Sequence, residues 1–204
     1  MRRRPRVVVL DYGSGNVRSA QRALERVGAD VRISADADEA LDADGLVVPG
    51  VGAFAACMSG LTRVGAVEVL RKRLETRRPI FGICVGFQVL FGFGVEHGVR
   101  SDGIGFWPGG VEQLRASILP HMGWNTVAAS DGSVLFRGVE HERFYFVHSY
   151  APHDAAPTAT WCRYDADRFL AAAEDGVVVG TQFHPEKSGD AGAAVLRNWL
   201  EAWA

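Results

Sequence analysis

Short apolar runs alternate with helix-spaced apolar positions along the first half of the chain. Short continuous apolar runs are typical of strands that are covered on both faces, whereas spacings of three and four residues are typical of amphipathic helices. These patterns predict an alternation of strands and helices that is characteristic of a doubly wound α/β fold with a mostly parallel central sheet. The expected strands are 7–10, 30–33, 46–48 and 80–83, and the expected helices are 17–27, before Gly28, and 64–75.

The second half of the chain has a different pattern, with short apolar segments separated by turn residues. Such a series predicts an antiparallel or mixed extension of the sheet. Because there is no internal repeat, linker or low-complexity tract, we expect a single domain over residues 1–204. The expected strands lie near Thr126 and at 144–147, 159–163, 169–173 and 177–183, followed by a final helix at 190–203.

Composition and charge argue against a nucleic-acid-binding, membrane or secreted protein. The chain has 204 residues, 48% of them hydrophobic, and a formal net charge of −2. This charge gives no general electrostatic reason to expect nucleic acid or an anionic membrane as a partner, and we interpret the basic residues 2–6 as a frayed terminus. No apolar run approaches the roughly 20 residues that span a bilayer, and no signal-peptide pattern is present, so we expect a cytoplasmic protein.

The three cysteines, Cys57, Cys84 and Cys162, form an odd number with no pair at metal-ligand spacing. A disulfide framework and a zinc site are therefore not expected, and we predict no metal and no cofactor. Each cysteine is then either a small buried residue or a reactive thiol. Only the surroundings of Cys84 favour a reactive thiol, and we interpret Cys57 and Cys162 as structural.

Gly82 and Gly86 flank Cys84 at the point where a buried strand turns into a helical pattern at 85–91. A sharp strand-to-helix turn brings backbone segments together, so glycines two residues before and after a nucleophile suit such an elbow. The N–H groups and dipole at the start of the helix favour a thiolate at Cys84, and the N–H of Val85 is placed to hold a developing oxyanion. A buried cysteine at the end of a core strand would show the same local pattern.

His184 and Glu186 lie at the end of another apolar strand pattern. In an extended segment, residues two positions apart point to the same side, so both side chains would face one site. The imidazole of His184 would take the proton from Cys84, and the carboxylate of Glu186 would orient that imidazole. A surface turn would also explain this pair taken alone, and the elbow at Cys84 is what favours a catalytic role.

A glycine-containing turn at 49–54 follows a third strand. In open parallel sheets, ligands bind beyond the carboxyl ends of the strands, so this loop and Cys84 would border one crevice. Gly50 and Gly52 allow the backbone to approach a ligand, and we hypothesise that the N–H of Val51 is the second oxyanion donor after a peptide flip. An ordinary strand-to-helix turn is the alternative.

These three elements, in this order, resemble the class I (triad-type) glutamine amidotransferases, and most specifically the glutaminase subunits of imidazole glycerol phosphate synthases. The resemblance runs over nearly the whole chain. The elbow and the His-Pro-Glu sequence are typical of the superfamily, whereas the segments at 119–125 and 145–150 are typical of this kind of subunit. The matching segments are DYGSGN at 11–16, PGVG at 49–52, the elbow with Gln88, LPHMGWN at 119–125, YFVHSY at 145–150 and QFHPEKSG at 182–189.

The resemblance implies a reaction, a substrate and a partner. Cys84 would attack the side-chain amide of glutamine, and the released ammonia would pass to a (β/α)8-barrel cyclase subunit in a heterodimer. That cyclase makes imidazole glycerol phosphate and aminoimidazole carboxamide ribotide in histidine biosynthesis. The resemblance also implies a glutamine pocket at Gly50, Gly52, Gln88, Glu96, Ser149 and Tyr150, and a partner interface at Asn16, His121, Met122 and Trp124.

Alternatives remain at several of these positions. Gln88 lies one helical turn beyond Cys84, which independently suits the pocket. Glu96 would equally suit an exposed acid in a loop, and the residues around Trp124 would also suit a local satellite of the core. The stretch 92–96 departs from the serine- and glutamate-rich sequence that is usual in the family.

Three competing functions share part of this sequence evidence. Another class I amidotransferase, serving vitamin B6, anthranilate or purine synthesis, would keep the triad and bind a different synthase. A cysteine hydrolase or peptidase of a related α/β fold would often take its acid from elsewhere in the chain. A catalytically silent regulatory or scaffolding subunit would need no triad at all.

Overall fold

The computed structural model describes residues 3–154 and 156–204. Its first half alternates strands and helices, as the apolar pattern predicts. The elements are β1 (Arg6–Leu10), α1 (Val17–Arg26), β2 (Asp30–Ser34), α2 (Ala37–Asp42), β3 (Gly45–Gly50), α3 (Phe54–Arg63), α4 (Ala66–Glu75) and β4 (Ile80–Cys84).

The second half is richer in strands. The single turn α5 (Val85–Gln88) leads into this region, and the helix α6 (Gly189–Trp203) closes the chain. The remaining elements are β5 (Phe91–Glu96), β6 (Val99–Asp102), β7 (Trp107–Gln113), β8 (His121–Thr126), β9 (Arg143–His148), β10 (Tyr150–Pro152), β11 (Thr158–Tyr164), β12 (Asp167–Asp175), β13 (Val178–Thr181) and the 3-10 turn η1 (Pro185–Lys187).

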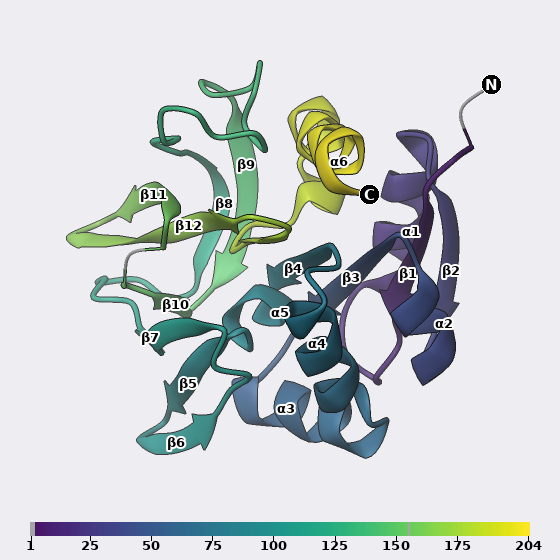
Figure 1. Cartoon of the computed structure of the whole chain (residues 1–204). Helices are drawn as coiled ribbons and strands as arrows, with labels where there is room; N and C mark the ends of the chain where they lie inside the picture. The colour runs from purple at the N-terminus through teal and green to yellow at the C-terminus, as the bar shows by residue number, and fades with distance from the viewer. Residues whose placement is uncertain (1–2, 155) are drawn as a thin grey trace.

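The main sheet has seven strands in the order β11-β12-β13-β4-β3-β1-β2 (Figure 1). The five strands from β13 to β2 pair in parallel, whereas β12 and β11 add on antiparallel to one edge. This arrangement confirms the predicted α/β fold with a mostly parallel central sheet and an antiparallel extension. A second sheet, β10-β7-β5-β6, and the β8–β9 ribbon lie on the side of the molecule away from β2.

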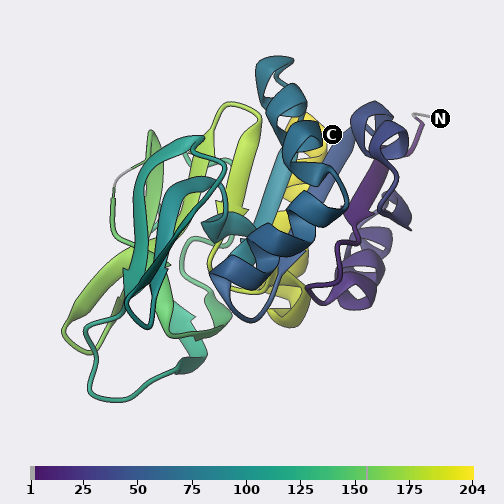
Figure 2. The ribbon, with the colours of Figure 1, turned by 90° about the horizontal axis from the view of Figure 1, so that it is seen from below.

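Helices cover both faces of the main sheet. Helix α6 contacts α1 on one face, and α4 contacts both α2 and α3 on the other. Figure 2 shows α3 and α4 on the near side of the sheet and α6 behind it. The strands between these layers are almost fully buried because both faces are covered, and Phe81 of β4 packs edge-on against Trp199 of α6 with ring centroids 5.4 Å apart.

Several predicted boundaries were wrong. The helix expected at 64–75 is α4, which begins two residues later than predicted, at Ala66, because Gly65 with a φ of +70° precedes it. The helix expected at 85–91 is a single turn that ends at Gln88, and Phe91 already belongs to β5. Helices α2 and α3 and strands β5, β6, β7 and β10 were not predicted.

The basic N-terminal stretch is only partly accounted for. Arg2 lies outside the described residues. Arg3 forms an ion pair with Asp44 at 2.9 Å, and Arg6 is the first residue of β1. From Arg3 onward the stretch therefore lies against the sheet, which contradicts the interpretation as a frayed terminus.

Candidate active site

The turn at Cys84 has the geometry of a nucleophile elbow. Cys84 ends the parallel strand β4 with φ +55° and ψ −113°, a backbone conformation that side-chain-bearing residues rarely adopt. A Cβ on Gly86 would collide with the carbonyl oxygen of Val48, and one on Gly82 would lie 2.7 Å from the carbonyl oxygen of Gly86. Both glycines are therefore needed, as the sequence predicted, for the strand and the following turn to pack so closely.

The turn after Cys84 supplies a free backbone donor. Val85 is the first residue of α5, so its N–H has no acceptor within the helix. Because α5 has four residues rather than the expected seven, its dipole contributes less to stabilising a thiolate than predicted. The positive potential that α5 directs at Cys84 therefore comes from the N–H groups of a single turn and not from a long helix.

His184 and Glu186 are in direct contact. Nδ1 of His184 lies 2.8 Å from Oε1 of Glu186, and each side chain is only 2% exposed. The segment is not extended, however, because residues 185–187 form the 3-10 turn η1. The pair was predicted correctly, but the reason given for it was wrong. A turn that begins with Pro185 brings the carboxylate back onto the ring.

Strand β9 holds the backbone of His184 in place. The N–H of His184 donates to the carbonyl of Tyr145 at 3.0 Å. The hydroxyl of Ser188 donates to the carbonyl of His184 at 2.7 Å and accepts from the N–H of Tyr145 at 2.9 Å. These three bonds fix the imidazole relative to the sheet, which is what a positioned general base requires.

The electrostatics at His184 favour its charged form. Burial alone would lower the pKa of His184, but its interactions with Cys84 and Glu186 outweigh burial and raise that pKa to about 10. Oε2 of Glu186 is buried and has no hydrogen-bond partner among the described residues. The arrangement therefore stabilises an imidazolium beside the sulfur, with a carboxylate behind it.

A hollow of about 210 Å³ opens in front of Cys84. Its lining residues come from five different parts of the chain and include nearly all the residues that were expected to bind glutamine. Gly50 and Glu186 do not line it, since Gly50 packs against Gly86 beneath the surface and Glu186 lies behind His184. The lining residues are Val51, Gly52, Cys84, Val85, Gln88, Glu96, Val147, His148, Ser149, Tyr150, His184 and Lys187.

The N–H of Val51 is engaged outside this hollow. It donates to Oγ of Ser14 at 3.3 Å, and the Ser14 hydroxyl donates to the carbonyl of Val51 at 2.7 Å. The buried hydroxyl of Tyr12 donates to the carbonyl of Pro49 at 2.6 Å. The loop is thus held from below by two hydroxyl groups of the segment after β1, which sequence reasoning had not assigned to the site.

Gln182 is a further residue that the sequence analysis missed. Its Nε2 points at Sγ of Cys84 at 3.7 Å, and its Oε1 accepts from Nε2 of Gln88 at 2.9 Å. Gln182 lies two residues before His184, so the period of two residues along a strand could have placed it on the same side.

Glu96 lies in the hollow rather than in an exposed loop. It ends strand β5, is half-buried, and forms no ion pair within the part of the chain that the structure describes. An unpaired carboxylate of this kind suits a cationic group of a ligand.

Comparison with known proteins identifies the family. The model of the class-I glutamine amidotransferase family matches residues 8–203. The chain belongs to this family. It is 60% identical over 200 residues to the imidazole glycerol phosphate synthase subunit HisH of Mycolicibacterium paratuberculosis, covering 96% of this chain and 97% of that protein. It is 58% identical over 209 residues to the subunit of the same name from Nocardia farcinica, covering 98% and 99%.

Solved structures show the same fold at low identity. A putative GMP synthase protein from Thermoplasma acidophilum superposes with a TM-score of 0.73 at 20% identity, covering 99% of this chain and 95% of that one. PurLQS from Thermotoga maritima gives a TM-score of 0.72 at 21% identity, covering 98% and 99%. At these identities the likeness concerns the fold alone.

The residues expected at a partner interface of this amidotransferase divide into two groups. Met122 and Trp124 on β8 are 65% and 53% exposed, and Asn16 is exposed before α1. His121 is 3% exposed and stacks on Tyr164, with ring centroids 4.1 Å apart. Because side chains alternate along a strand, His121 points inward where Met122 and Trp124 point outward, so its assignment to the interface was wrong.

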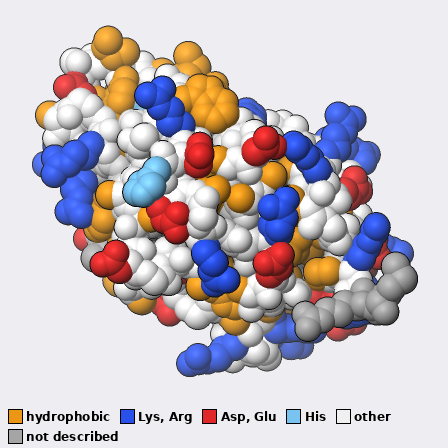
Figure 3. All heavy atoms as spheres, turned by 90° about the horizontal axis from the view of Figure 1, so that it is seen from above, with side chains coloured by type: hydrophobic (Ala, Val, Ile, Leu, Met, Phe, Trp, Pro, Cys, Tyr) orange, Lys and Arg blue, Asp and Glu red, His pale blue; other side chains and the backbone are white. Residues whose placement is uncertain are grey.

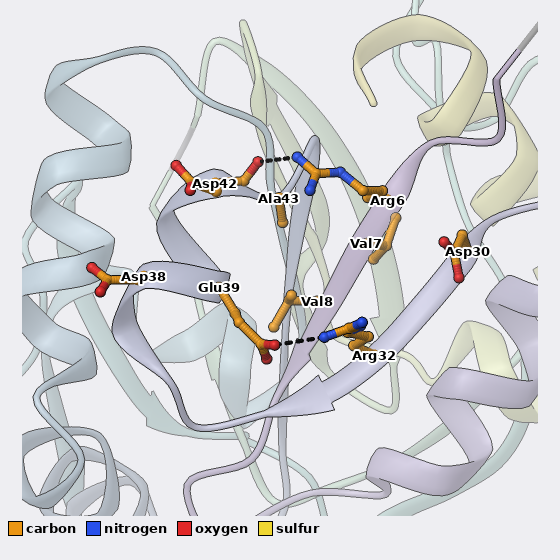
Figure 4. Close-up of a pocket in the computed structure, with 9 residues that line it drawn as sticks. All are labelled: Arg6, Val7, Val8, Asp30, Arg32, Asp38, Glu39, Asp42 and Ala43. Carbon is orange, nitrogen blue, oxygen red and sulfur yellow. Dashed lines mark hydrogen bonds and ion pairs between the residues drawn. The ribbon is translucent and has the colours of Figure 1, made fainter.

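Elsewhere on the amidotransferase, a hollow of about 330 Å³ lies at the opposite end of the main sheet, between β1, β2 and α2 (Figure 4). Both of its arginines have partners. Arg32 pairs with Glu39 at 2.7 Å, and Arg6 donates to the carbonyl of Asp42 at 3.0 Å (Figure 4). This hollow holds neither a nucleophile nor an unpaired buried acid.

Other classes of ligand place requirements on surface charge, helix length and the grouping of possible metal ligands. Figure 3 shows Lys and Arg interspersed with Asp and Glu over one face, without a continuous basic patch there. No helix in the described part of the chain is long and apolar enough to cross a membrane. Within residues 3–154 and 156–204, no three His, Cys, Asp or Glu side chains group as metal ligands would.

Proposed function

We propose that this chain hydrolyses glutamine to glutamate and ammonia, with Cys84 as the nucleophile. The observation that carries the proposal is the convergence of Cys84, in its strained elbow, with the buried His184–Glu186 pair at one hollow. A nucleophile next to a base that a third group orients is the arrangement that acyl transfer requires.

In the first half of the reaction, the thiolate of Cys84 attacks the side-chain amide carbon of glutamine, and the amide oxygen becomes an oxyanion. The N–H of Val85 stabilises this charge. His184 donates its proton to the amide nitrogen, the carbon–nitrogen bond breaks, and ammonia leaves. The product is a thioester between Cys84 and the glutamyl group.

In the second half, water attacks the thioester carbonyl while His184 accepts a proton from that water. The carbon–sulfur bond then breaks, which releases glutamate and restores the thiolate of Cys84. Glu186 stays ionised and holds the ring of His184 throughout. In the glutamine pocket, Glu96 faces the α-ammonium group as its counter-ion.

Ammonia passes to a (β/α)8-barrel cyclase subunit of imidazole glycerol phosphate synthase, in a heterodimer that serves histidine biosynthesis in the cytoplasm. Relatives that are 60% and 58% identical over almost their whole length carry the name of that synthase's HisH subunit. The exposed Met122 and Trp124 are apolar residues on one strand face and suit a partner surface. Asn16 belongs to the same proposed interface.

Docking of the cyclase subunit brings the second oxyanion donor, the N–H of Val51, into position. In the isolated chain the N–H of Val51 is bound to Ser14, whereas the N–H of Val85 has no acceptor within α5. Reorientation of the peptide before Val51 directs the N–H of Val51 at the oxyanion. Because one oxyanion donor is worth about 10²–10³ in rate, the isolated chain is a weak glutaminase.

Glutamate release by the purified chain tests this proposal. The rate of release is to be measured for the chain alone, for the chain with the cyclase subunit, and for the chain with the cyclase subunit plus its nucleotide ligand. Stimulation by at least about 10²-fold in the last mixture is expected. Hydrolysis that ignores the cyclase would assign the chain to another class I amidotransferase, and absence of hydrolysis in all three mixtures would overturn the proposal.

A further inference from the structure

Two buried histidines outside the triad connect strand β8 to the hollow. His121 and His148 are 3% and 7% exposed, and His148 lines the hollow in front of Cys84. Nδ1 of His121 lies 3.1 Å from Nε2 of His148, and Nδ1 of His148 lies 3.0 Å from the carbonyl oxygen of Tyr150. The reaction described above uses neither ring.

The direction of these hydrogen bonds follows from the acceptor at one end. A carbonyl oxygen can only accept, so Nδ1 of His148 carries a hydrogen. Burial lowers the pKa of His148 to about 3 and that of His121 to about 4, so both rings are neutral near pH 7. A neutral His148 must then accept at Nε2, and Nδ1 of His121 is the donor to it.

The chain of bonds begins at an amide with a fixed orientation. Nε2 of His121, which carries no hydrogen in this tautomer, lies 3.3 Å from Nδ2 of Asn125 and accepts from it. The same Nδ2 donates to the carbonyl of Arg163 at 3.0 Å, and Oδ1 of Asn125 accepts from the N–H of Thr126 at 2.8 Å. Both ends of the amide are therefore assigned, and the hydrogen bonds run one way from Asn125 to the hollow.

At the hollow, the carbonyl of Tyr150 sets the orientation of two glutamine amides. It also accepts from Nε2 of Gln88 at 2.8 Å, and the second hydrogen of that Nε2 goes to Oε1 of Gln182. Oε1 of Gln88 is thus left as an acceptor for a ligand. Gln182 is left with its N–H groups toward Sγ of Cys84, where they stabilise a thiolate.

We propose that Asn125, His121 and His148 are positioning residues, whose one-way hydrogen bonds hold the Tyr150 carbonyl so that Gln88 offers its Oε1 to a donor group of the substrate. This inference rests on the proposed function for the identity of that substrate, glutamine. A donor on glutamine, either its side-chain amide or its α-ammonium group, is the chemistry that this acceptor recognises.

The alternative role of the two rings is packing. His121 stacks on Phe146 and Tyr164 with centroid distances of 4.8 and 4.1 Å, so a phenyl ring would fill its place. Packing alone predicts that a phenylalanine variant keeps its affinity for glutamine. Positioning predicts that affinity falls unless the replacement can still donate to Tyr150.

The kinetic test uses the complex with the cyclase and its nucleotide ligand. For His148→Phe we expect KM for glutamine to rise about tenfold with kcat changed less than about threefold, the loss of about one hydrogen bond. His148→Asn, whose Nδ2 occupies the place of Nδ1, restores most of the affinity. Tyr164→Phe, which keeps the stack on His121, matches wild type. Wild-type KM in His148→Phe, or equal impairment in both His148 variants, overturns the inference.

A second readout does not depend on activity. In the isolated full-length chain, ¹⁵N–¹H correlations of labelled histidine rings report the tautomer of each ring. We expect His121 and His148 to be neutral with the hydrogen on Nδ1 at pH 7. A hydrogen on Nε2 of either ring, or an imidazolium there, overturns the inference. A wild-type complex that hydrolyses no glutamine would overturn the proposed function and leave this spectrum as the deciding test.

Discussion

The two hollows at opposite ends of the main sheet differ in what their charged groups do. The hollow between β1, β2 and α2 is the larger, about 330 Å³ against about 210 Å³, yet its arginines are paired with neighbouring acids or carbonyls. The hollow at Cys84 holds a strained nucleophile, an unpaired carboxylate at Glu96 and a histidine held in its charged form. Unsatisfied and strained groups, rather than volume, therefore distinguish a site that can do chemistry.

The largest effect expected is at the nucleophile. Cys84→Ala should lower glutamate release by the complex at least about 10⁴-fold, because the remaining groups cannot form the thioester. Steady-state kinetics measure this loss. Cys162→Ala is the matched control, since burial raises the pKa of the Cys162 thiol to about 12 and keeps it unreactive. A Cys84→Ala complex that retained most of its activity would place the chemistry elsewhere.

The next effect is at the acid behind the base. Glu186→Gln removes the charge that helps to raise the pKa of His184, so we expect kcat to fall about 10²-fold. Glu174→Gln controls for the loss of a buried carboxylate. Glu174 accepts hydrogen bonds from Val134 and Leu135, so this change should lower the melting temperature without a specific loss of activity. Equal losses of activity in both variants would argue against a triad role for Glu186.

The two hollows should also differ in their effect on stability in acid, because only the hollow at Cys84 is lined by buried histidines. The folded-state pKa of His148 is lowered to about 3, beneath the unfolded value of about 6.5. The unfolded chain therefore binds a proton that the folded chain does not, and stability is lost as the pH falls below 6.5. His148 alone should lower the free energy of unfolding by about 2 kcal/mol between pH 7.5 and pH 5.

Urea unfolding at both pH values measures this difference. His148→Phe should lose less stability on acidification than wild type, because it lacks the titrating group. His121, His153 and His184 are the other titratable groups that act on His148, and they are present in both proteins. The same loss on acidification in both proteins would show that His148 is charged in the folded state.

A smaller effect concerns the loop beside the hollow. Ser14→Ala removes the hydroxyl that binds both the N–H and the carbonyl of Val51, so turning this peptide costs about 0.5–1.5 kcal/mol less. Glutamate release by the isolated chain should rise about three- to tenfold, whereas the fully activated complex should change little. Ser34→Ala, which removes a hydroxyl that binds the N–H of Asp36 and not Val51, is the control. An unchanged or lower rate in the isolated Ser14→Ala chain would contradict the proposed resting state of Val51.

The smallest effect is expected at the larger hollow. Arg32→Ala breaks the exposed pair with Glu39 and should leave both the kcat and the KM of the complex at wild-type values, with a small change in melting temperature. Kinetics of this variant beside Glu186→Gln compare the two hollows directly. A loss of activity above about tenfold in Arg32→Ala would contradict the claim that the larger hollow takes no part in the reaction.

The elements that the sequence revealed are those with strong local patterns. Strands β1, β3 and β4 are largely apolar runs, and the parallel arrangement of β1 to β4 follows from the helices between them. Helix α2 was missed because its six residues bury only Ala40. Strand β5 was missed because Phe91 and Phe93 follow the elbow and continue its apparent helical pattern, while glycines separate the aromatic residues that define the strand.

The residues of the site also divide into those that a local sequence pattern predicted and those that it did not. Cys84 lies in an elbow sequence, and His184 and Glu186 lie two residues apart, so these short segments taken together predicted the triad. Tyr12 and Ser14 act through partners that lie 37 positions away in the sequence, so no local pattern marks them. Gln182 could have been found from its two-residue spacing to His184, but its contact with Gln88 spans 94 positions. The tautomers of His121 and His148 depend on the carbonyl of Tyr150, which lies next to His148 in the folded chain. The family resemblance suggested that His121 faces a partner, whereas its side chain is buried.

The central claim is that the hollow at Cys84 binds glutamine. The most direct measurement is covalent labelling of the complex with a chloroketone analogue of glutamine, followed by peptide mass spectrometry. We expect modification of Cys84 alone and protection by excess glutamine. Labelling of Cys57 or Cys162 in place of Cys84, or labelling of Cys84 that glutamine does not slow, would contradict this claim.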